Sequence, residues 1–249
     1  MAGIALCMRT IGLLGGLSWE ASVEYEAVIN RTVRARLGGS AAGDVWIRSY
    51  NFAAIQRLQE AGDWDALESW LASDGCVLAA AGSEVLGICA NTMHLAYPAL
   101  RAALDAAGHH GVEVVHVGDA AGAAAVTGGH TCVGLIGTRY TMQEPFLRDW
   151  LQQRHGLVVL TPEDRDQTHV HRIIYDELVR GVVRDGSRDL LLGVVDRLVE
   201  RGVTAVVSAC TELELLLDEE DLHDLAAGPV AWLPTAKLHA LALAEAALA

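Results

Sequence analysis

The sequence predicts an α/β protein of two similar lobes, each a parallel sheet flanked by helices, related by pseudo-twofold symmetry. Short apolar segments alternate with amphipathic helical segments along the 249-residue chain, which is the pattern of βα units around a parallel sheet. The segments "GLLGG" and "GLIGT" begin 122 residues apart, at Gly12 and Gly134, and Cys89 and Cys210 lie 121 residues apart. These nearly equal offsets indicate an internal repeat.

Each predicted strand is a short apolar run that ends at glycine or polar residues, and each predicted helix repeats its apolar residues with the helical period. Residues able to cap a helix follow two strands directly, Asn91 and Thr92 in the first half and Thr211 in the second. In the first half the predicted strands are Ile11 to Gly15, Val45 to Tyr50, Val85 to Cys89 and Glu113 to Val117, and the predicted helices are Trp19 to Leu37, Ala66 to Ala81 and Thr92 to Ala107.

The second half continues the alternation after a glycine- and alanine-rich segment, 118–130, which marks the expected seam. We therefore expect an N-terminal lobe of residues 1–117, completed by residues 211–249, and a second lobe of residues 118–210. The predicted strands of this half are Thr131 to Ile136, Leu157 to Leu160, Thr204 to Ser208 and Val230 to Leu233, and the predicted helices are Met142 to His155, Val170 to Val183 and Ser187 to Arg201.

Composition disfavours several functions. The net charge of −14 and the scattered arginines disfavour nucleic acid as a partner. The apolar runs are shorter than the roughly 18 residues of a membrane span, and the N-terminus lacks the pattern of an export signal. We therefore expect a cytoplasmic protein with no membrane partner. The single lysine, Lys237, lies in a predicted C-terminal helix, which disfavours a pyridoxal phosphate Schiff base.

The five cysteines include no C-x-x-C pair, which argues against a disulfide framework and against a structural zinc site. A free cysteine is most often a small buried apolar side chain. We expect that role for Cys7, Cys76 and Cys132.

Cys89 and Cys210 differ because each ends a predicted strand and precedes a predicted helix. Ligands of open parallel sheets bind outside the carboxyl ends of the strands, and a helix N-terminus lowers the pKa of a thiol below its usual value of about 8.5. If the lobes close face to face, with the active site between them, the two thiols approach one carbon from opposite sides. One thiol can then remove a proton while the other delivers one, which inverts a stereocentre.

Four segments, "IGLLGGLSWEASVEYEAVIN", "ICANTMH", "LIGTRYTM" and "SACTELELL", resemble the characteristic blocks of the aspartate/glutamate racemase family. These are cofactor-independent enzymes with two catalytic cysteines, and the likeness is to the bacterial L-aspartate/glutamate-specific and broad-specificity amino-acid racemases. The resemblance extends from Ile11 to about His239. It implies an amino-acid racemase or epimerase with an amino-acid substrate, no metal or organic cofactor, and a homodimeric assembly.

By this resemblance Cys89 and Cys210 are the two acid–base residues, and Asn91, Thr92 and Thr138 donate to the α-carboxylate of the substrate. The same donors would stabilise the enolate-like charge that develops when the α-proton leaves. The further candidates for the carboxylate are the backbone N–H groups near Gly15, Gly16 and Thr211. Glu212 either binds the ammonium group or faces solvent in the first turn of a helix, and Arg57, Arg48 and Arg139 either bind a side-chain carboxylate or are solvated. Tyr140 and Thr141 are candidates for the pocket wall, and His94 either acts on the thiol and pocket or pairs with nearby backbone.

The chain departs from the family pattern at two positions. Pro234 stands where relatives carry an aspartate before threonine, and Glu214 stands where a small residue is usual. Both changes put the preference for aspartate or glutamate in doubt. The alternatives are a decarboxylase or a cis-trans isomerase of the same superfamily, or a non-catalytic two-lobed sensor of small carboxylates.

Overall fold

The computed structural model describes residues 8–217 and 219–249, so Cys7 lies outside the described residues. The chain forms two compact units, one of the described residues up to His116 together with His239–Ala249, and the other of Val117–Leu238. The chain thus returns to the first unit at His239, whereas the sequence analysis placed this return at residue 211. The reason is that the last strand, residues 231–234, pairs within the sheet of the second unit.

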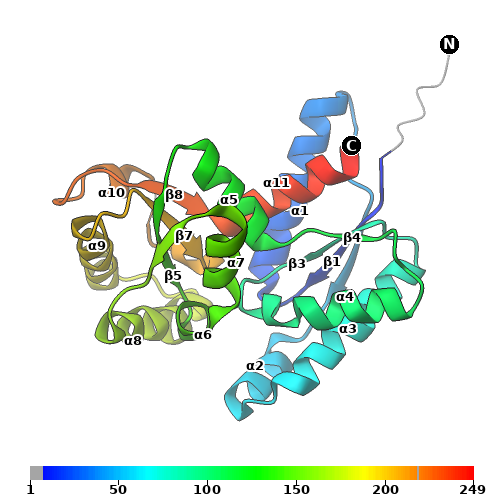
Figure 1. Ribbon diagram of the computed structural model, residues 1–249, viewed down its shortest axis with the longest axis horizontal. Coiled ribbons are helices and arrows are strands. Elements are labelled where there is room, and N and C mark those ends of the chain that lie inside the picture. Colours follow the sequence, from blue (N-terminus) through cyan, green and yellow to red (C-terminus); the bar gives the residue numbers. More distant parts are fainter. Residues whose placement is uncertain (1–7, 218) are drawn as a thin grey trace. The chain divides into compact units, whose positions relative to one another are not determined.

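The first unit contains a four-stranded parallel sheet. Its elements are β1 (Ile11–Gly15), α1 (Trp19–Leu37), β2 (Val45–Ser49), α2 (Phe52–Ala61), α3 (Trp64–Ala80), β3 (Val85–Ile88), the 3-10 helix η1 (Thr92–Ala96), α4 (Tyr97–Ala106), β4 (Glu113–Val114) and the C-terminal part of α11 (Thr235–Leu248). The strand order is β2-β1-β3-β4. Leu86 and Ile88 of β3 pack into a core with α3 and α4. On the other side of the sheet, Leu243 of α11 fills the space beside Gly87, and Figure 1 shows α11 beside α1.

The second unit repeats this architecture with the strand order β6-β5-β7-β8. Its elements are α5 (Val117–Thr127), β5 (Cys132–Gly137), α6 (Arg139–Gln143), α7 (Pro145–His155), β6 (Val158–Leu160), α8 (Asp164–Arg172), the π-helix η2 (Ile173–Glu177), the 3-10 helix η3 (Leu178–Arg180), α9 (Asp185–Glu200), β7 (Ala205–Ala209), the 3-10 helix η4 (Thr211–Leu215), α10 (Glu219–His223) and β8 (Ala231–Pro234). Strands β5 to β8 occupy the positions of β1 to β4. The predicted α/β fold of two similar lobes is confirmed.

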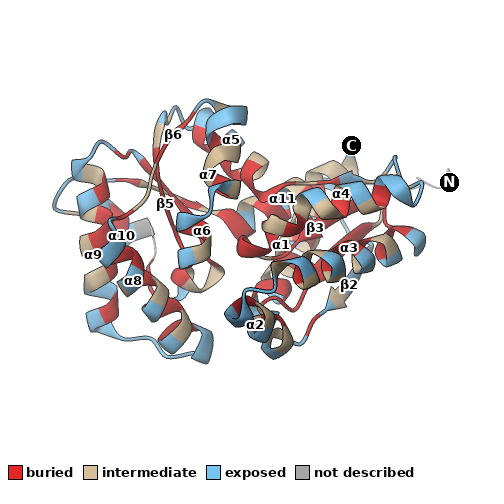
Figure 2. Cartoon of the chain, turned by 60° about the horizontal axis from the view of Figure 1, so that its bottom comes forward, coloured by how far each residue is buried: buried red, intermediate tan, exposed pale blue. Residues whose placement is uncertain are grey.

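The central strands of both sheets are covered on both faces, which is why they read as continuous apolar runs and not as alternating ones. In the second unit, Val206 of β7 packs in a core with α8 and α9. Its neighbour Val207 packs in a separate core with α5 and α7. Figure 2 shows the central strands β3 and β5 in the colour of buried residues.

Two helical segments differ from the prediction. The segment Met142 to His155, predicted as one helix, is divided between α6 and α7, because Glu144 takes an extended conformation (ψ 143°) before Pro145. Proline disfavours helical geometry in the residue before it and suits the first turn of a new helix. The predicted seam 118–130 is mostly helix α5.

The described residues contain no helix that is both long and apolar enough to cross a membrane.

The turn between β1 and α1 requires glycine at position 16. Gly16 has φ of 70°, and a Cβ there would lie 2.3 Å from the backbone nitrogen of Tyr50. We expect Gly16→Ala to lower the free energy of unfolding by about 3 kcal/mol, since backbone strain and a clash act together. Gly62→Ala is the matched control, because Gly62 has φ of 69° with open space around it. Urea titrations that give equal losses for both variants would contradict the clash.

Candidate functional site

Cys210 follows directly after β7 at the carboxyl edge of the second sheet. In the parallel pairing of β5 with β7, Gly137 lies opposite Ala209. The next residues, Thr138 and Cys210, therefore leave neighbouring strands at the same edge, about 5 Å apart in the direction of pairing. Both side chains are largely buried. The second unit thus places a thiol and a hydroxyl where ligands of parallel sheets bind.

The Cys210 thiol has a carboxylate partner. Its Sγ–H donates to Oε2 of Glu212 at 3.0 Å, and the Thr211 hydroxyl donates to the same oxygen at 3.2 Å. The sequence analysis assigned Glu212 to the substrate ammonium, whereas the structure pairs it with the thiol. The Glu212 carboxylate thus accepts hydrogen bonds from both the Cys210 thiol and the Thr211 hydroxyl.

The protonation state of Cys210 differs from the expectation. Burial raises the pKa of the thiol well above its usual value, and the Glu212 carboxylate raises it further. The backbone N–H groups of Glu212 and Leu213 act in the opposite direction, as expected for a helix start, but these two groups do not outweigh burial and a nearby negative charge. The resting thiol is therefore protonated, and its Sγ–H contacts the Glu212 carboxylate.

Replacing Glu212 with glutamine is expected to lower both the pKa of the Cys210 thiol and the rate of turnover. The pKa of Cys210 should fall, because the negative charge that raises it is removed. Turnover should fall as well, by at least about tenfold, since the amide cannot accept the proton of the thiol. Alkylation of Cys210 followed by mass spectrometry across pH measures the pKa. A midpoint that stays the same or rises would show that Glu212 does not control the thiol.

Thr138 caps α6 and does not stand free. Its Oγ1 accepts from the backbone N–H of Thr141 at 3.3 Å and lies 3.1 Å from the Thr141 hydroxyl. Next to it, the backbone N–H of the exposed Arg139 donates to Nδ1 of His171 at 3.2 Å. Tyr140 packs edge-on against the same imidazole. Burial and the Arg139 charge lower the pKa of His171, which favours the neutral imidazole. His171, which the sequence analysis did not single out, thus contacts the residues that follow Thr138.

The two departures from the family pattern lie beside β7. Pro234 ends β8 opposite Ser208 of β7, and the Thr235 hydroxyl donates to the Ser208 carbonyl at 2.8 Å. Pro234 is uncharged and lies opposite Ser208, which precedes Cys210 by two residues. Glu214 forms an ion pair with Lys237, the single lysine of the chain.

Cys89 lies in different surroundings. It follows β3 and is only 1% exposed. Burial alone raises the pKa of this thiol, and Cys89 in turn raises the pKa of the buried Tyr25 of α1. Cys89 therefore lies near Tyr25 inside the first unit, and no carboxylate is among the causes of its pKa shift.

Asn91 and Thr92 are buried in the turn that follows β3. The turn is held by His94, whose Nδ1–H donates to the Ala90 carbonyl at 2.9 Å. His94 thus pairs with nearby backbone, as one of the interpretations of the sequence expected. The His94 ring packs edge-on against the ring of His116, with centroids 4.7 Å apart.

The same cluster includes two residues that the sequence did not single out, Tyr25 and His239. Nε2–H of His239 donates to the Val115 carbonyl at 2.9 Å, so its Nδ1 accepts from the Tyr25 hydroxyl at 2.8 Å. The His239 ring also packs against His94. No local sequence pattern indicates these contacts, because they join α1, η1 and α11 across 214 residues.

The remaining candidates of the first unit are already engaged or lie on its surface. The N–H of Gly16 donates to the Ser22 hydroxyl at 2.7 Å, and Gly15 lies at the end of β1, packed against Ser22 and Ile47. Arg48 pairs with Asp74 at 3.1 Å and stacks over Tyr50. Arg57 is exposed on α2.

Cys76 and Cys132 are half-buried and pack against the apolar cores of the first and second units respectively. Both pack as small apolar side chains, as expected from the sequence, but neither is fully buried.

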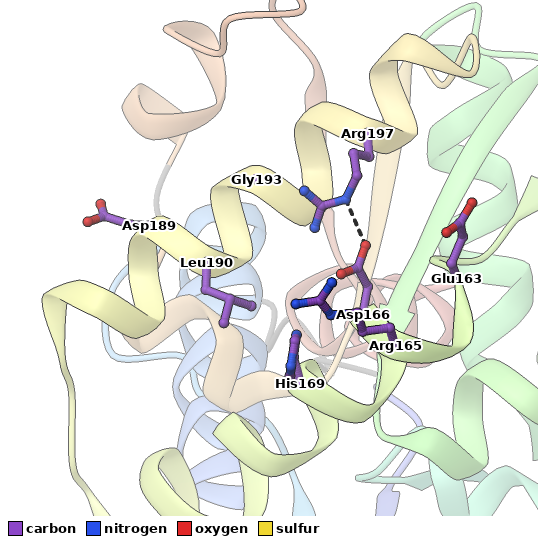
Figure 3. Close-up of a pocket in the computed structure, with 8 residues that line it drawn as sticks. All are labelled: Glu163, Arg165, Asp166, His169, Asp189, Leu190, Gly193 and Arg197. Carbon is purple, nitrogen blue, oxygen red and sulfur yellow. Dashed lines mark hydrogen bonds and ion pairs between the residues drawn. The ribbon is translucent and has the colours of Figure 1, made fainter.

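A pocket of about 480 Å³ lies between α8 and α9 of the second unit. The ion pair between Asp166 and Arg197, 2.7 Å long, crosses it, as Figure 3 shows. None of the site residues predicted from the sequence lines this pocket. Its residues are Glu163, Arg165, Asp166, His169, Asp189, Leu190, Gly193 and Arg197.

These features define a class of α/β protein with two units of the same strand order and a thiol after the third strand of each sheet. A family model described as Asp/Glu/Hydantoin racemase matches residues 14–242. The chain therefore belongs to the Asp/Glu/hydantoin racemase family, and the resemblance seen in the sequence is confirmed.

The chain is similar to a protein from Yersinia pestis described as a putative Asp/Glu racemase, with 37% identity, a TM-score of 0.87, and coverage of 97% of this chain and 100% of that one. An aspartate racemase homologue from Pyrococcus horikoshii OT3 is 26% identical, with a TM-score of 0.79 and coverage of 96% and 99%. An uncharacterized protein in the pnlA 3′ region of Pectobacterium carotovorum subsp. carotovorum is 36% identical over 90 residues, and the match spans only 58% of its length.

Proposed function

We propose that the protein is an amino-acid racemase or epimerase that needs no cofactor and transfers the α-proton of aspartate, glutamate or a related amino acid. The observation that carries the proposal is the hydrogen bond between Cys210 and Glu212 at the carboxyl edge of β7. Family membership supports the reaction class. The likeness to an aspartate racemase homologue supports an amino acid as the substrate.

In the proposed reaction Glu212 accepts the proton of the Cys210 thiol, and the resulting thiolate removes the α-proton of the substrate. The C–H bond breaks, an S–H bond forms, and the electron pair delocalises into the substrate carboxylate. Donors near this edge, among them the Thr138 hydroxyl, stabilise that charge. Return of a proton to the opposite face gives the other enantiomer. Cys89 was assigned this second transfer from the sequence, and that role stays a prediction.

The test is a panel of L- and D-amino acids incubated with the purified protein and separated by chiral chromatography. The proposal expects the opposite enantiomer of at least one acidic or related amino acid to form without added metal or pyridoxal phosphate. If every amino acid of the panel keeps its configuration, the proposed racemase function is wrong.

A second candidate function is decarboxylation of a substrate that carries two carboxyl groups on one carbon. In this reaction CO₂ leaves and a single thiol protonates the same carbon, so one acid–base group is sufficient. The difference between the two cysteines favours this candidate, because Cys210 has a carboxylate partner whereas Cys89 is enclosed near Tyr25. Release of CO₂ from such diacids, with no racemisation of amino acids, would select it.

A further inference from the structure

The chain passes between its two units twice, and a buried histidine of the first unit stands at each crossing. The first unit is left after His116 and entered again at His239. Both side chains are almost fully enclosed, with exposed fractions of 2% and 0%. Nε2–H of His239 donates to the carbonyl of Val115, the residue before His116, at 2.9 Å. This hydrogen bond ties the two crossings to each other within the first unit.

A third buried histidine, His94, contacts both of these rings. Its ring packs edge-on against the ring of His116, with centroids 4.7 Å apart, and against the ring of His239, with centroids 5.5 Å apart. The ring of Tyr97 packs edge-on against His116 at 4.8 Å. The Tyr25 hydroxyl donates to Nδ1 of His239 at 2.8 Å. We call these three imidazoles and two phenol rings the histidine cluster.

The histidine cluster is joined to the turn that carries Cys89. Nδ1–H of His94 donates to the Ala90 carbonyl at 2.9 Å, and the backbone N–H of His94 donates to the Asn91 carbonyl at 3.0 Å. The turn from Cys89 to Thr92 holds one of the two predicted acid–base thiols and two predicted donors to the α-carboxylate. His94 therefore connects this turn to both crossings.

The contacts of the histidine cluster use neutral imidazoles with defined tautomers. Burial lowers the pKa of both His94 and His239, so each ring has one nitrogen that donates and one that accepts. His94 donates from Nδ1, whereas His239 donates from Nε2 and accepts at Nδ1. Rings that are enclosed and hydrogen-bonded in this way have a fixed orientation, which is what a supporting shell of an active site requires.

We infer that the histidine cluster is a positioning device that couples the two chain crossings to the turn of Cys89 and thereby sets the reactivity of this thiol. The inference rests on the proposed function and deepens it, since Cys89 is predicted to carry out the second proton transfer. The residues of the histidine cluster act through the turn, so they are positioning residues and not catalytic ones. Because the histidine cluster belongs to the first unit, altering it should leave the reactivity of Cys210 unchanged.

The test uses two pairs of variants that are matched in shape and differ in hydrogen bonding. His94→Asn keeps a donor near the position of Nδ1, whereas His94→Leu has a similar size and no donor. His239→Gln keeps an amide that can donate to Val115 and accept from Tyr25, whereas His239→Met has a similar length and no donor. Iodoacetamide labelling followed by mass spectrometry gives the alkylation rate of each thiol separately. Cys210 then serves as an internal control.

We expect His94→Leu and His239→Met to raise the alkylation rate of Cys89 by about fivefold or more, because a turn released from the histidine cluster exposes its thiol more often. The amide variants, His94→Asn and His239→Gln, should stay within about twofold of wild type. In the racemisation assay His94→Leu and His239→Met should lower kcat by about tenfold or more, and by more than they raise KM, because a misplaced thiol slows proton transfer. The amide variants should recover most of this loss.

Cys76 distinguishes positioning from general loosening, because it packs against the core of the first unit outside the histidine cluster. The inference is overturned if His94→Leu and His239→Met are folded by circular dichroism and leave the alkylation rate of Cys89 unchanged. It is also overturned if the alkylation rate of Cys76 rises as much as that of Cys89.

If these variants do not fold, Tyr25→Phe decides the question, since it removes only the hydroxyl that donates to His239. It should raise the alkylation rate of Cys89 by about twofold or more, and an unchanged rate overturns the inference. A wild-type protein that neither exchanges nor inverts any amino acid refutes the proposed function. The alkylation rates still decide the inference in that case, so the two failures are distinguishable.

Discussion

Replacing Cys210 with alanine is expected to lower the rate of α-hydrogen exchange by at least about 100-fold, since the variant has no group that can take the proton at this position. Cys210→Ser is expected to lose as much. The serine hydroxyl keeps a donor to Glu212 but is a far weaker acid than the thiol. Both variants should retain the fold, because Cys210 contributes a small side chain at the margin of a large core. Proton NMR in deuterated water measures the exchange.

Cys132→Ala is the matched control, because Cys132 is half-buried in β5 and packs against the same core. It should keep activity within about twofold of wild type. A Cys210→Ala protein that still exchanges the α-hydrogen at the wild-type rate would show that another group transfers the proton.

Stability is expected to fall steeply in acid because of His239. Burial lowers the pKa of His239 to about 4, against about 6.5 for an unfolded histidine. Between these values the unfolded chain binds a proton that the folded chain does not, so stability is complete above pH 6.5 and falls as the pH drops towards 4. The loss from this residue amounts to about 3 kcal/mol at pH 4. The pKa of the neighbouring His94 is also lowered by burial, which adds to the loss.

His239→Gln tests this account, since an amide can still donate to Val115 and accept from Tyr25 but does not titrate. Urea unfolding between pH 7 and pH 4 should show a shallower loss of stability for this variant than for wild type. His110→Gln is the control, because His110 is an exposed histidine of the same unit. Equal slopes for wild type and His239→Gln would contradict a buried neutral imidazole. The His239 ring contacts the Tyr25 hydroxyl and the His94 ring, and His116 packs against His94.

Much of the fold could be predicted from local pattern. The strand Ile11–Gly15 and the helix Trp19–Leu37 have the predicted bounds. The apolar periodicity and the capping residues that indicate a strand or helix belong to that same segment, so no distant contact is needed to predict it. The return of the chain to the first unit at His239 could not be predicted this way. It depends on pairing of β8 with β7, which is a contact between distant residues.

The candidate site was predictable in composition but not in detail. The sequence indicated that cysteines end the third strand of each lobe, and both do follow these strands. It could not indicate that Cys89 lies near the buried Tyr25, although β3 and β7 both end directly before their cysteines. The pairing of Glu212 with the thiol was also missed, because its direction depends on the 3-10 turn that follows β7.

The most direct test of the central claim, transfer of the α-proton without a cofactor, is the fate of that hydrogen in the wild-type protein. The protein is dialysed against a chelator and incubated in deuterated water with L- or D-aspartate, glutamate and related amino acids, and the α-hydrogen signal is followed by proton NMR. The account predicts that this signal declines for at least one of them without any added metal or organic cofactor. A signal that stays constant for every amino acid, from a protein shown to be folded, would contradict it.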